Sequence, residues 1–330
     1  MERSPVNHGR SNRFDKEVSM TEQFRITRMY HPSFHAPDLG EVEAWFERVF
    51  GCQSTNIYET FKGRETGNYP TSYSTFTPMA DVLMDTIQPT LYVLNGVQQY
   101  ASVDKPHLKT IGWFDDNPQA VYSSLRQAGI AMVDQFGKPA EGEEAPRSAG
   151  SGAMPIYFTT PESAGLRHEF LPDFPFGLDH RNAPGWSAAE APEGPLGLLR
   201  CAYHTLLTGN PERALHTLVD ALGGTVFYEE RDEVIGAAAS YVALSDSVLQ
   251  VAVPDQGTAA YADWTTTAPN DTYHSLTFKV ADLDRAAEHL KSQGVGIRSR
   301  TGDFLVTDPD TSINVPWGFT THLVPGDPRA

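Results

Sequence analysis

The chain has 330 residues, 40% of them hydrophobic and 20% charged, which is typical of a folded globular protein and excludes overall disorder. Its 25 Lys and Arg against 42 Asp and Glu give a formal net charge of −17. Nucleic acids and membrane surfaces are anionic, so this charge predicts that neither is a partner. No apolar run approaches the roughly 18 residues of a membrane-spanning helix. Because two cysteines cannot form a disulfide framework, we expect a cytoplasmic protein.

Residues 1–22 are polar, of mixed charge and without hydrophobic periodicity, so we expect a disordered tail there. Met20 precedes the first strand-like run, and residues 1–19 are either native or an upstream extension. The folded part of the chain is therefore predicted to begin near residue 23.

From residue 24 onward, one pattern of about eighty residues occurs four times. Each copy has a short β-type run with a histidine, an Asp or Asn, an amphipathic helical stretch and a glycine. In the first copy, apolar residues from Val42 to Phe50 recur at the spacing of one helix face. Asp and Asn are favoured immediately before a helix, and glycine immediately after one. We therefore predict four helices that begin after Asp38, Asn117, Asn210 and Asp282 and end at Gly51, Gly129, Gly223 and Gly294.

Further β-type runs, separated by turn residues, follow each predicted helix, so each copy is interpreted as a β-α-β-β-β module. Copies one and two are predicted to form domain one, residues 23–178, and copies three and four domain two, residues 197–326. The stretch between them, residues 179–196, is rich in Pro, Gly and Ala and is typical of a linker.

Four such modules, each with a histidine on its first strand, resemble the vicinal oxygen chelate superfamily. This group includes glyoxalase I, fosfomycin-resistance proteins, bleomycin-binding proteins and type I extradiol ring-cleaving dioxygenases. The resemblance covers roughly residues 24–325. It implies an α+β fold in which four βαβββ modules pair into two open barrel-like domains. It also implies a divalent metal held by one histidine from each of two first strands and a glutamate from a last strand.

In domain one, the resemblance assigns the ligand positions to His31, His107 and Glu169, the last in TTPESAGLRHEFLP, which is similar to the superfamily ending DPxGxxxE. His107 follows Pro106 in a strand of ambiguous register, so Lys109 or Thr110 are alternatives for its position. The modules could also pair across the chain rather than in sequence order.

In domain two, the resemblance assigns the ligand positions to His204, His274 and His322. His322 stands in VPWGFTTHLVP where the superfamily has a glutamate, and this departure counts against dioxygenase activity in domain two. We expect at most one of the two sites to be catalytically competent. His35 lies four residues after His31, on the same side of a strand, and is our candidate for acid–base catalysis.

The resemblance implies a metal-dependent enzyme that acts on a small molecule. Our first hypothesis is an extradiol-type ring-cleaving dioxygenase that uses Fe²⁺ on a catecholic or related aromatic substrate, with Zn²⁺, Mn²⁺ or Ni²⁺ as alternative metals. The second is a glyoxalase-like lyase, isomerase or epimerase that works through a metal-stabilised enediolate. The third is a non-catalytic binding or resistance protein. Relatives often form homo-oligomers, so one is an option here too.

Overall fold

The four predicted helices begin at their predicted caps. The computed structural model describes residues 23–148, 153–188, 192 and 194–330, and the predicted tail lies outside them. The side chains of the four predicted cap residues each accept a hydrogen bond from a backbone N–H in the first helical turn. The helices are α1 (Leu39–Phe50), α3 (Pro118–Gln127), α5 (Pro211–Leu215) and α7 (Leu283–Ser292), and α5 continues as the π-helix η3 (His216–Ala221). Gly51 follows α1 with φ of 72°, a conformation that favours glycine.

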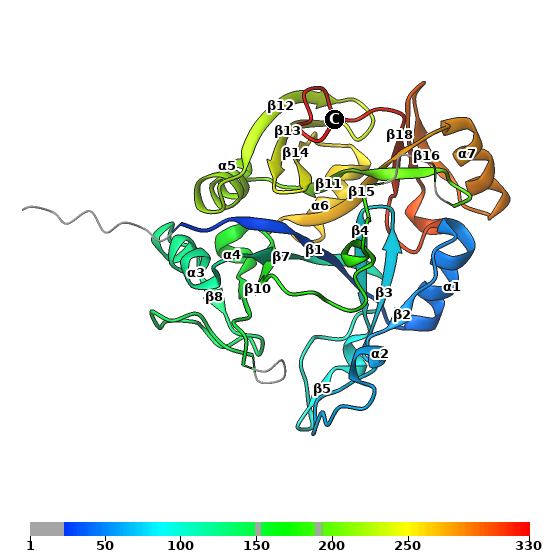
Figure 1. Ribbon diagram of the computed structural model, residues 1–330. Helices are drawn as coiled ribbons and strands as arrows, with labels where there is room; N and C mark the ends of the chain where they lie inside the picture. Colours follow the sequence, from blue (N-terminus) through cyan, green and yellow to red (C-terminus); the bar gives the residue numbers. More distant parts are fainter. Residues whose placement is uncertain (1–22, 149–152, 189–191, 193) are drawn as a thin grey trace, which may run out of the picture.

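Two eight-stranded sheets form the framework, one for each predicted domain (Figure 1). The first has the order β2-β3-β4-β1-β7-β10-β9-β8. Its strands are β1 (Ile26–His35), β2 (Thr55–Asn56), β3 (Ser74–Met79), β4 (Val82–Ile87), β7 (His107–Asp115), β8 (Met132–Val133), β9 (Tyr157–Thr159) and β10 (Arg167–Pro172). The second has the order β12-β13-β14-β11-β15-β18-β17-β16. Its strands are β11 (Leu198–Leu207), β12 (Thr225–Asp232), β13 (Ala237–Leu244), β14 (Ser247–Pro254), β15 (Thr272–Val280), β16 (Ile297–Arg300), β17 (Phe304–Thr307) and β18 (Gly318–Thr320).

The first strands of consecutive modules pair at the centre of each sheet. β1 pairs antiparallel with β7, and β11 pairs antiparallel with β15. Each first strand also pairs in parallel with the last strand of its own module, as β1 does with β4 and β7 with β10. The predicted α+β fold of four paired βαβββ modules is therefore confirmed, and modules pair in sequence order.

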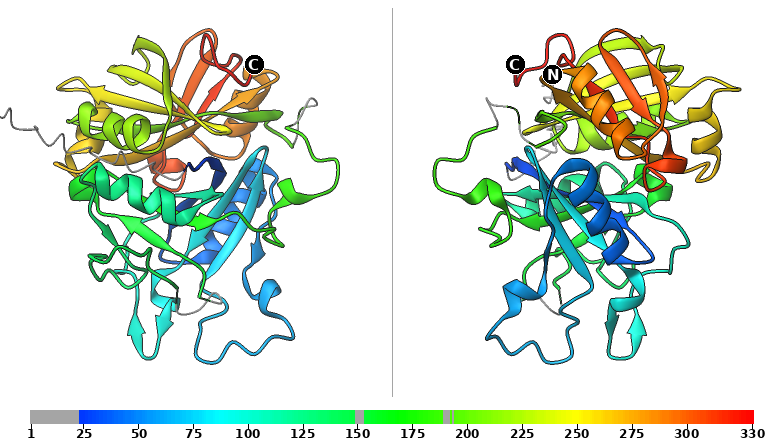
Figure 2. Two further views of the ribbon diagram at one scale, coloured as in Figure 1. Left: turned by 60° about the vertical axis from the view of Figure 1, so that its left-hand side comes forward. Right: turned by 90° about the vertical axis from the view of Figure 1, so that its right-hand side faces the viewer.

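Short elements occupy the connections between these strands. They are α2 (Tyr58–Phe61), η1 (Pro89–Leu91), the hairpin of β5 (Val93–Leu94) and β6 (Val97–Gln98), α4 (Pro161–Ala164), η2 (His180–Asn182), α6 (Ala259–Thr265) and η4 (Pro309–Thr311). The two ribbon views in Figure 2 show the two sheets stacked, with the loops around α2 and β5 extending from domain one on the side remote from domain two.

One hydrophobic core continues from domain one into domain two. Trp45, Phe46 and Phe50 on α1 are buried against Trp317, which comes from the last module. The rings of Trp45 and Trp317 stack with centroids 5.9 Å apart, and Phe50 lies 5.2 Å from Trp317 and 5.8 Å from Phe278 on β15. Burial of such large rings is among the strongest contributions to stability, so the two domains stabilise each other.

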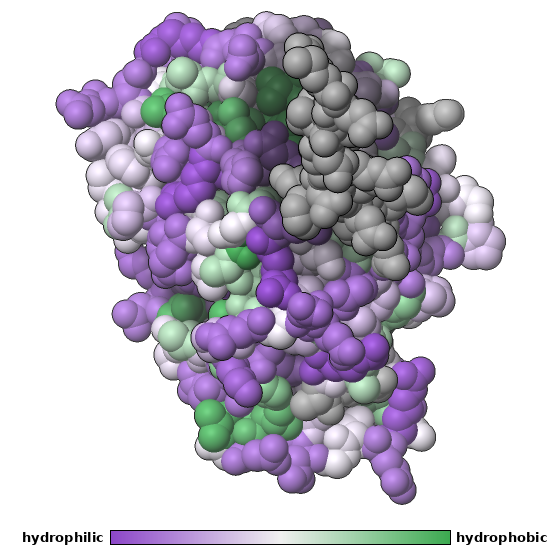
Figure 3. Space-filling model, turned by 90° about the vertical axis from the view of Figure 1, so that its left-hand side faces the viewer, coloured by the Kyte–Doolittle hydropathy of each residue, from purple (hydrophilic) through white to green (hydrophobic). Residues whose placement is uncertain are grey.

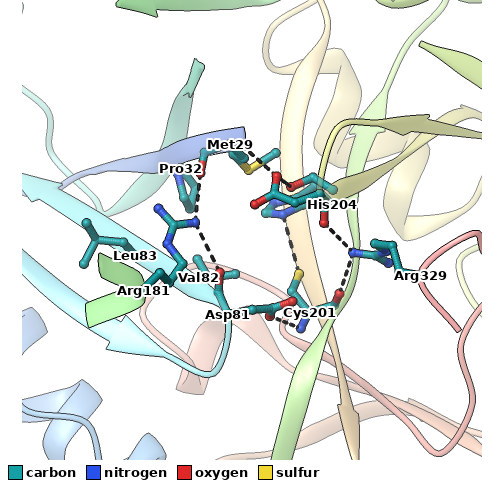
Figure 4. Close-up of a pocket in the computed structure, with 11 residues that line it drawn as sticks. Met29, Pro32, Asp81, Val82, Leu83, Arg181, Cys201, His204 and Arg329 are labelled. Carbon is teal, nitrogen blue, oxygen red and sulfur yellow. Dashed lines mark hydrogen bonds between the residues drawn. The ribbon is translucent and has the colours of Figure 1, made fainter. Parts of the chain in front are cut away.

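Two aspartates form reciprocal hydrogen bonds across the domain boundary. Asp81, between β3 and β4, accepts the backbone N–H of Cys201 on β11 at 2.6 Å (Figure 4). In the other direction Asp246, between β13 and β14, accepts the backbone N–H of Met29 on β1 at 2.8 Å. Because the two contacts occupy equivalent places, they relate the domains by an approximate two-fold axis.

An arginine accompanies each of these contacts. Arg181 pairs with Asp179 and donates hydrogen bonds to two backbone oxygens of β1. Arg329 pairs with Asp327 and donates to two backbone oxygens of β11. Asp179 and Arg181 lie inside the predicted linker 179–196, so this part of it is bound firmly to domain one.

The exterior agrees with the acidic, polar composition. On the face drawn in Figure 3, hydrophilic residues predominate and the hydrophobic ones form small separate groups. In the described part of the chain, no helix has the length and apolarity needed to cross a membrane.

The shared core predicts that replacing Trp317 destabilises both domains together. Trp317→Ala should lower the free energy of unfolding by about 3–5 kcal/mol, because a fully buried indole leaves a large cavity. Guanidinium denaturation followed by both fluorescence and circular dichroism should give one transition for the wild type. Trp186→Ala is the matched control, since Trp186 is 38% exposed and should cost much less. Equal losses in the two variants would contradict the shared core.

Candidate functional site

A cavity of about 1140 Å³ opens in domain one, inside the curve of its sheet. Strands β1, β4, β7 and β10 provide its floor, and the segments 57–73 and 92–100 provide much of its wall. Aromatic side chains dominate that wall: Tyr30, Phe61, Tyr69, Tyr73, Phe76, Tyr92, Tyr100, Phe158, Phe174 and Phe176. A cavity with this lining is suited to a small aromatic molecule.

Three side chains of types that can bind a metal ion meet at the floor of this cavity. Nε2 of His31 lies 3.7 Å from Oε2 of Glu169 and 3.9 Å from Oδ2 of Asp85. His31 and Asp85 are buried, at 4% and 6% exposure. Nδ1 of His31 is 3.3 Å from the hydroxyl of Ser33, a contact that holds the ring with Nε2 turned toward the two carboxylates.

Burial sets the protonation of these three groups. It raises the pKa of Glu169 to about 7, against a smaller opposing effect of Arg167. Burial and the nearby Glu169 raise the pKa of Asp85 well above its ordinary value. Burial and the charge of Arg181 lower the pKa of His31 to about 3, so this imidazole is neutral at physiological pH. Neither of the two carboxylates forms an ion pair with a described Lys or Arg.

The strand pairing shows why His31 and the carboxylates meet. Asp85 on β4 lies beside Ser33 on β1, and Glu169 on β10 lies beside Gly112 on β7. Ser33 and Gly112 therefore hold equivalent places in the two modules. A Cβ atom at Gly112 would lie only 3.1 Å from Cε1 of His31, so the glycine leaves room for the imidazole ring.

Thr110 occupies the place predicted for the second histidine. His31 stands two residues before Ser33, and Thr110 stands two residues before Gly112. Thr110 is buried and lines the cavity. Of the three residues considered for this place, the structure therefore puts Thr110 there, and not His107 or Lys109.

His107 lies at the start of β7, away from the other two predicted ligands. It is opposite His35 in the antiparallel pair, with ring centroids 6.0 Å apart, and its Nδ1 contacts the backbone oxygen of Lys105 at 3.1 Å. His35 lines the cavity and is buried. Burial lowers the pKa of His35 to about 3, with further lowering by the nearby His107, Lys109 and Arg167.

In domain two, the corresponding places hold neither histidine nor carboxylate. Thr205 on β11 lies beside Gln250 on β14, so Gln250 takes the place of the aspartate. Tyr203 takes the place of the first histidine, since it stands two residues before Thr205, and Gly318 takes that of the glutamate. The Gln250 amide accepts a hydrogen bond from Thr205 at 2.7 Å and donates one to Tyr241 at 2.8 Å. The polar atoms of this amide therefore have partners within the chain.

His204 faces the domain boundary instead of the interior of domain two. Its Nδ1 lies 2.5 Å from the hydroxyl of Tyr273, and its Nε2 lies 3.6 Å from Sγ of Cys201 (Figure 4). The Tyr-His pairs of copies one and three suggest that His204 corresponds to His31. The strand register instead makes Tyr203, one residue earlier, the counterpart of His31. Adjacent residues on a strand face opposite sides, so this shift reverses the direction of the side chain.

The other two predicted ligands of domain two are also apart. His274 sits at an irregularity of β15, and its Nε2 is 3.1 Å from Oδ2 of Asp263 on α6. His322 follows β18 and is exposed. The structure does not bring His204, His274 and His322 together, and we do not retain them as candidate ligands.

The sequence analysis did not identify Asp85. A signal was present, because VLMDTI places one acidic residue inside a buried apolar strand. That strand is also the last of its module, as β10 is, so Asp85 is the counterpart of Glu169. Among the described residues, no group of three or more His, Cys, Asp or Glu side chains is already arranged to hold a metal ion.

Comparisons of the whole structure place this architecture among known folds. No protein-family model matches the chain, and no curated protein does. A variant of 4-hydroxymandelate synthase from Streptomyces coelicolor is similar over 89% of this chain and 92% of its own, with a TM-score of 0.58 and 12% identity. A Mn(II)-bound glyoxalase from Novosphingobium aromaticivorans is similar over 90% and 83%, with a TM-score of 0.55 and 12% identity. A variant of homoprotocatechuate 2,3-dioxygenase from B. fuscum is similar over 94% and 75%, with a TM-score of 0.54 and 14% identity. This chain therefore has the paired-module fold of the vicinal oxygen chelate superfamily.

Proposed function

We propose that domain one is a metal-dependent enzyme that carries out a redox-neutral proton transfer, of the lyase, isomerase or epimerase type, on a small aromatic substrate. The observation that carries this proposal is the meeting of His31, Asp85 and Glu169 at the floor of an aromatic cavity. A bound divalent ion would polarise a substrate carbonyl and stabilise the enediolate formed from it.

The three side chains suit a divalent ion in charge. Two carboxylates match its charge, and a neutral imidazole is the protonation state that a ligand needs. Oδ1 of Asp85 is buried without a hydrogen-bond partner, as expected for an atom that has a cation as its natural partner. Nε2 of His31 is 3.7 and 3.9 Å from the two carboxylates, so these side chains would move closer together to bind one ion.

Glu169 is our candidate for the proton transfer. It is a carboxylate at the floor of the cavity, where it can take a proton from a substrate that lies there, and in the metal-free protein burial raises its pKa to about 7. His35, our earlier candidate, lies in the cavity but has a pKa of about 3, which makes it a weak base. We propose that His35 stays neutral and offers hydrogen bonds to the substrate.

The donor set favours this chemistry over the ring-cleaving dioxygenase that was our first hypothesis. Non-haem Fe²⁺ oxygenases typically use two histidines and one carboxylate. Here the second histidine position is Thr110, and the third donor is a second carboxylate, Asp85. One histidine with two carboxylates suits Mn²⁺ and other ions that prefer oxygen ligands. Mn²⁺ is also the metal of one glyoxalase that shares this fold.

Metal binding should depend on domain one alone. We expect the wild type to bind about one Mn²⁺ per chain, and His31→Ala, Asp85→Asn and Glu169→Gln to lose at least tenfold in affinity. Equilibrium dialysis with mass-spectrometric metal analysis measures this directly. His322→Ala is the control, since this exposed residue should leave binding unchanged. Retention of full affinity by all three cavity variants would refute the site.

The affinity for Mn²⁺ should fall as the pH drops below about 7. The ion must displace a proton from Glu169 and also from Asp85, whose pKa is raised too, so each pH unit below about 7 weakens binding at least tenfold. Titration calorimetry at pH 6, 7 and 8 tests this. The metal-free protein should behave in the opposite sense and lose stability as the pH rises through about 7, because ionisation of a buried Glu169 is unfavourable. Affinity that stays constant between pH 6 and 8 would contradict this assignment.

The reaction class can be tested by hydrogen exchange. With Mn²⁺-loaded protein and 2-hydroxyacetophenone in D₂O, we expect NMR to show deuterium replacing the protons next to the carbonyl. Glu169→Gln should reduce the exchange rate by about 10²-fold or more, the usual contribution of a general base. An oxygen electrode with a catechol panel provides the alternative outcome. Oxygen uptake that disappears in His31→Ala would overturn the redox-neutral proposal in favour of the dioxygenase.

A further inference from the structure

Arg167 places a positive charge beside the aromatic cavity. It lies on β10 two residues before Glu169, so both side chains project from the same side of the strand. Its neighbour in the parallel pair with β7 is Thr110, which lines the cavity. The guanidinium lies 4.1 Å from the ring centre of Phe158 and 5.7 Å from that of Tyr100, and both rings also line the cavity.

This guanidinium forms no ion pair with a described carboxylate, and its charge acts on Glu169 only at longer range. Its Nε is buried without a hydrogen bond, and no described carboxylate lies within 4.0 Å of it. Three other well-covered arginines contrast with it, because each holds a carboxylate: Arg181, Arg213 and Arg329. Burying part of an unpaired guanidinium costs free energy. Such a group beside a cavity therefore points to a ligand that supplies the missing anion.

We propose that Arg167 binds a carboxylate group carried by the aromatic substrate, at the end opposite the reacting oxygens. A planar guanidinium matches a carboxylate through two parallel hydrogen bonds, and the rings of Phe158 and Tyr100 hold it in place. The inference rests on the proposed function, which places the reacting end of the substrate at His31, Asp85 and Glu169.

The geometry also limits the shape of the substrate. Two residues along a strand span about 7 Å, so Arg167 and Glu169 address different ends of one ring system. In a chain of net charge −17, with two carboxylates on the cavity floor, an anionic substrate would otherwise be repelled. Arg167 offsets that repulsion and would select aryl acids over neutral aryl compounds of the same shape.

The test compares 4-(hydroxyacetyl)benzoate with its uncharged analogue 4-(hydroxyacetyl)benzamide, by calorimetric binding to metal-free protein. The wild type should bind the acid about 10- to 100-fold more tightly than the amide, which is the usual contribution of a hydrogen-bonded charge pair. Arg167→Met should remove this preference while leaving the affinity for the amide within about twofold. Arg167→Lys should keep part of the preference, because it retains the charge and loses the fork of donors.

Arg126→Met is the matched control, since Arg126 also lies over an aromatic ring, that of Tyr122, but this ring does not line the cavity, whereas Phe158 and Tyr100 do. It should leave the preference for the acid intact. His31→Ala separates the two proposals: the preference should persist in this variant even though metal binding is lost. Equal affinity of the wild type for acid and amide, or an undiminished preference in Arg167→Met, would overturn the role of Arg167.

Discussion

The antiparallel pairing of the two first strands in each domain is the constraint on which the rest of the structure depends. In domain one the pairing of β1 with β7 brings the last strands, β4 and β10, to equivalent places on either side. Side chains from these four strands then line the floor of one cavity. A shift of one residue in that register would turn His31 away from the cavity, because neighbouring side chains face opposite sides of a sheet.

Domain two shows the result of the same pairing with different side chains. Its central strands, β11 and β15, have the same register relationship as β1 and β7. The inward places nevertheless hold Tyr203, Gln250 and Gly318, and hydrogen bonds within the chain satisfy the amide of Gln250. The same backbone therefore carries an aromatic cavity in domain one, with His31, Asp85 and Glu169 at its floor, and a fully hydrogen-bonded Gln250 at the corresponding place in domain two.

Much of the fold could be predicted from the sequence because its signals are local. Cap residues, helical periodicity and terminal glycines each act within one turn, and all four helices follow them. His31 could be predicted from its place on the first strand of its module, and Glu169 from the ending TTPESAGLRHEFLP. The structure brings these two side chains together, and metal binding by them stays a prediction.

The remaining positions could not be predicted because they depend on strand register. The Tyr-His pair of copy three suggested a ligand at His204, yet the pairing of β11 with β14 and β15 shows that Tyr203 stands at the place of His31. Pro106 obscured the start of β7 in the same way, and so Thr110 remained one of three alternatives. Asp85 and Arg167 carry no motif of their own. Only the parallel pairs with β1 and β7 reveal which side of the sheet they face.

The reciprocal contacts at the domain boundary make domain two necessary for domain one, even though the proposed site lies in domain one. Cys201 and Met29 each give a backbone N–H to an aspartate of the opposite domain, and the core around Trp317 crosses the same boundary. Domain one without domain two would expose the aromatic face of α1 and leave the backbone N–H of Met29 without its partner, and such a face promotes aggregation. Domain two is thus free to change its interior chemistry over evolutionary time, but its outward face must be preserved.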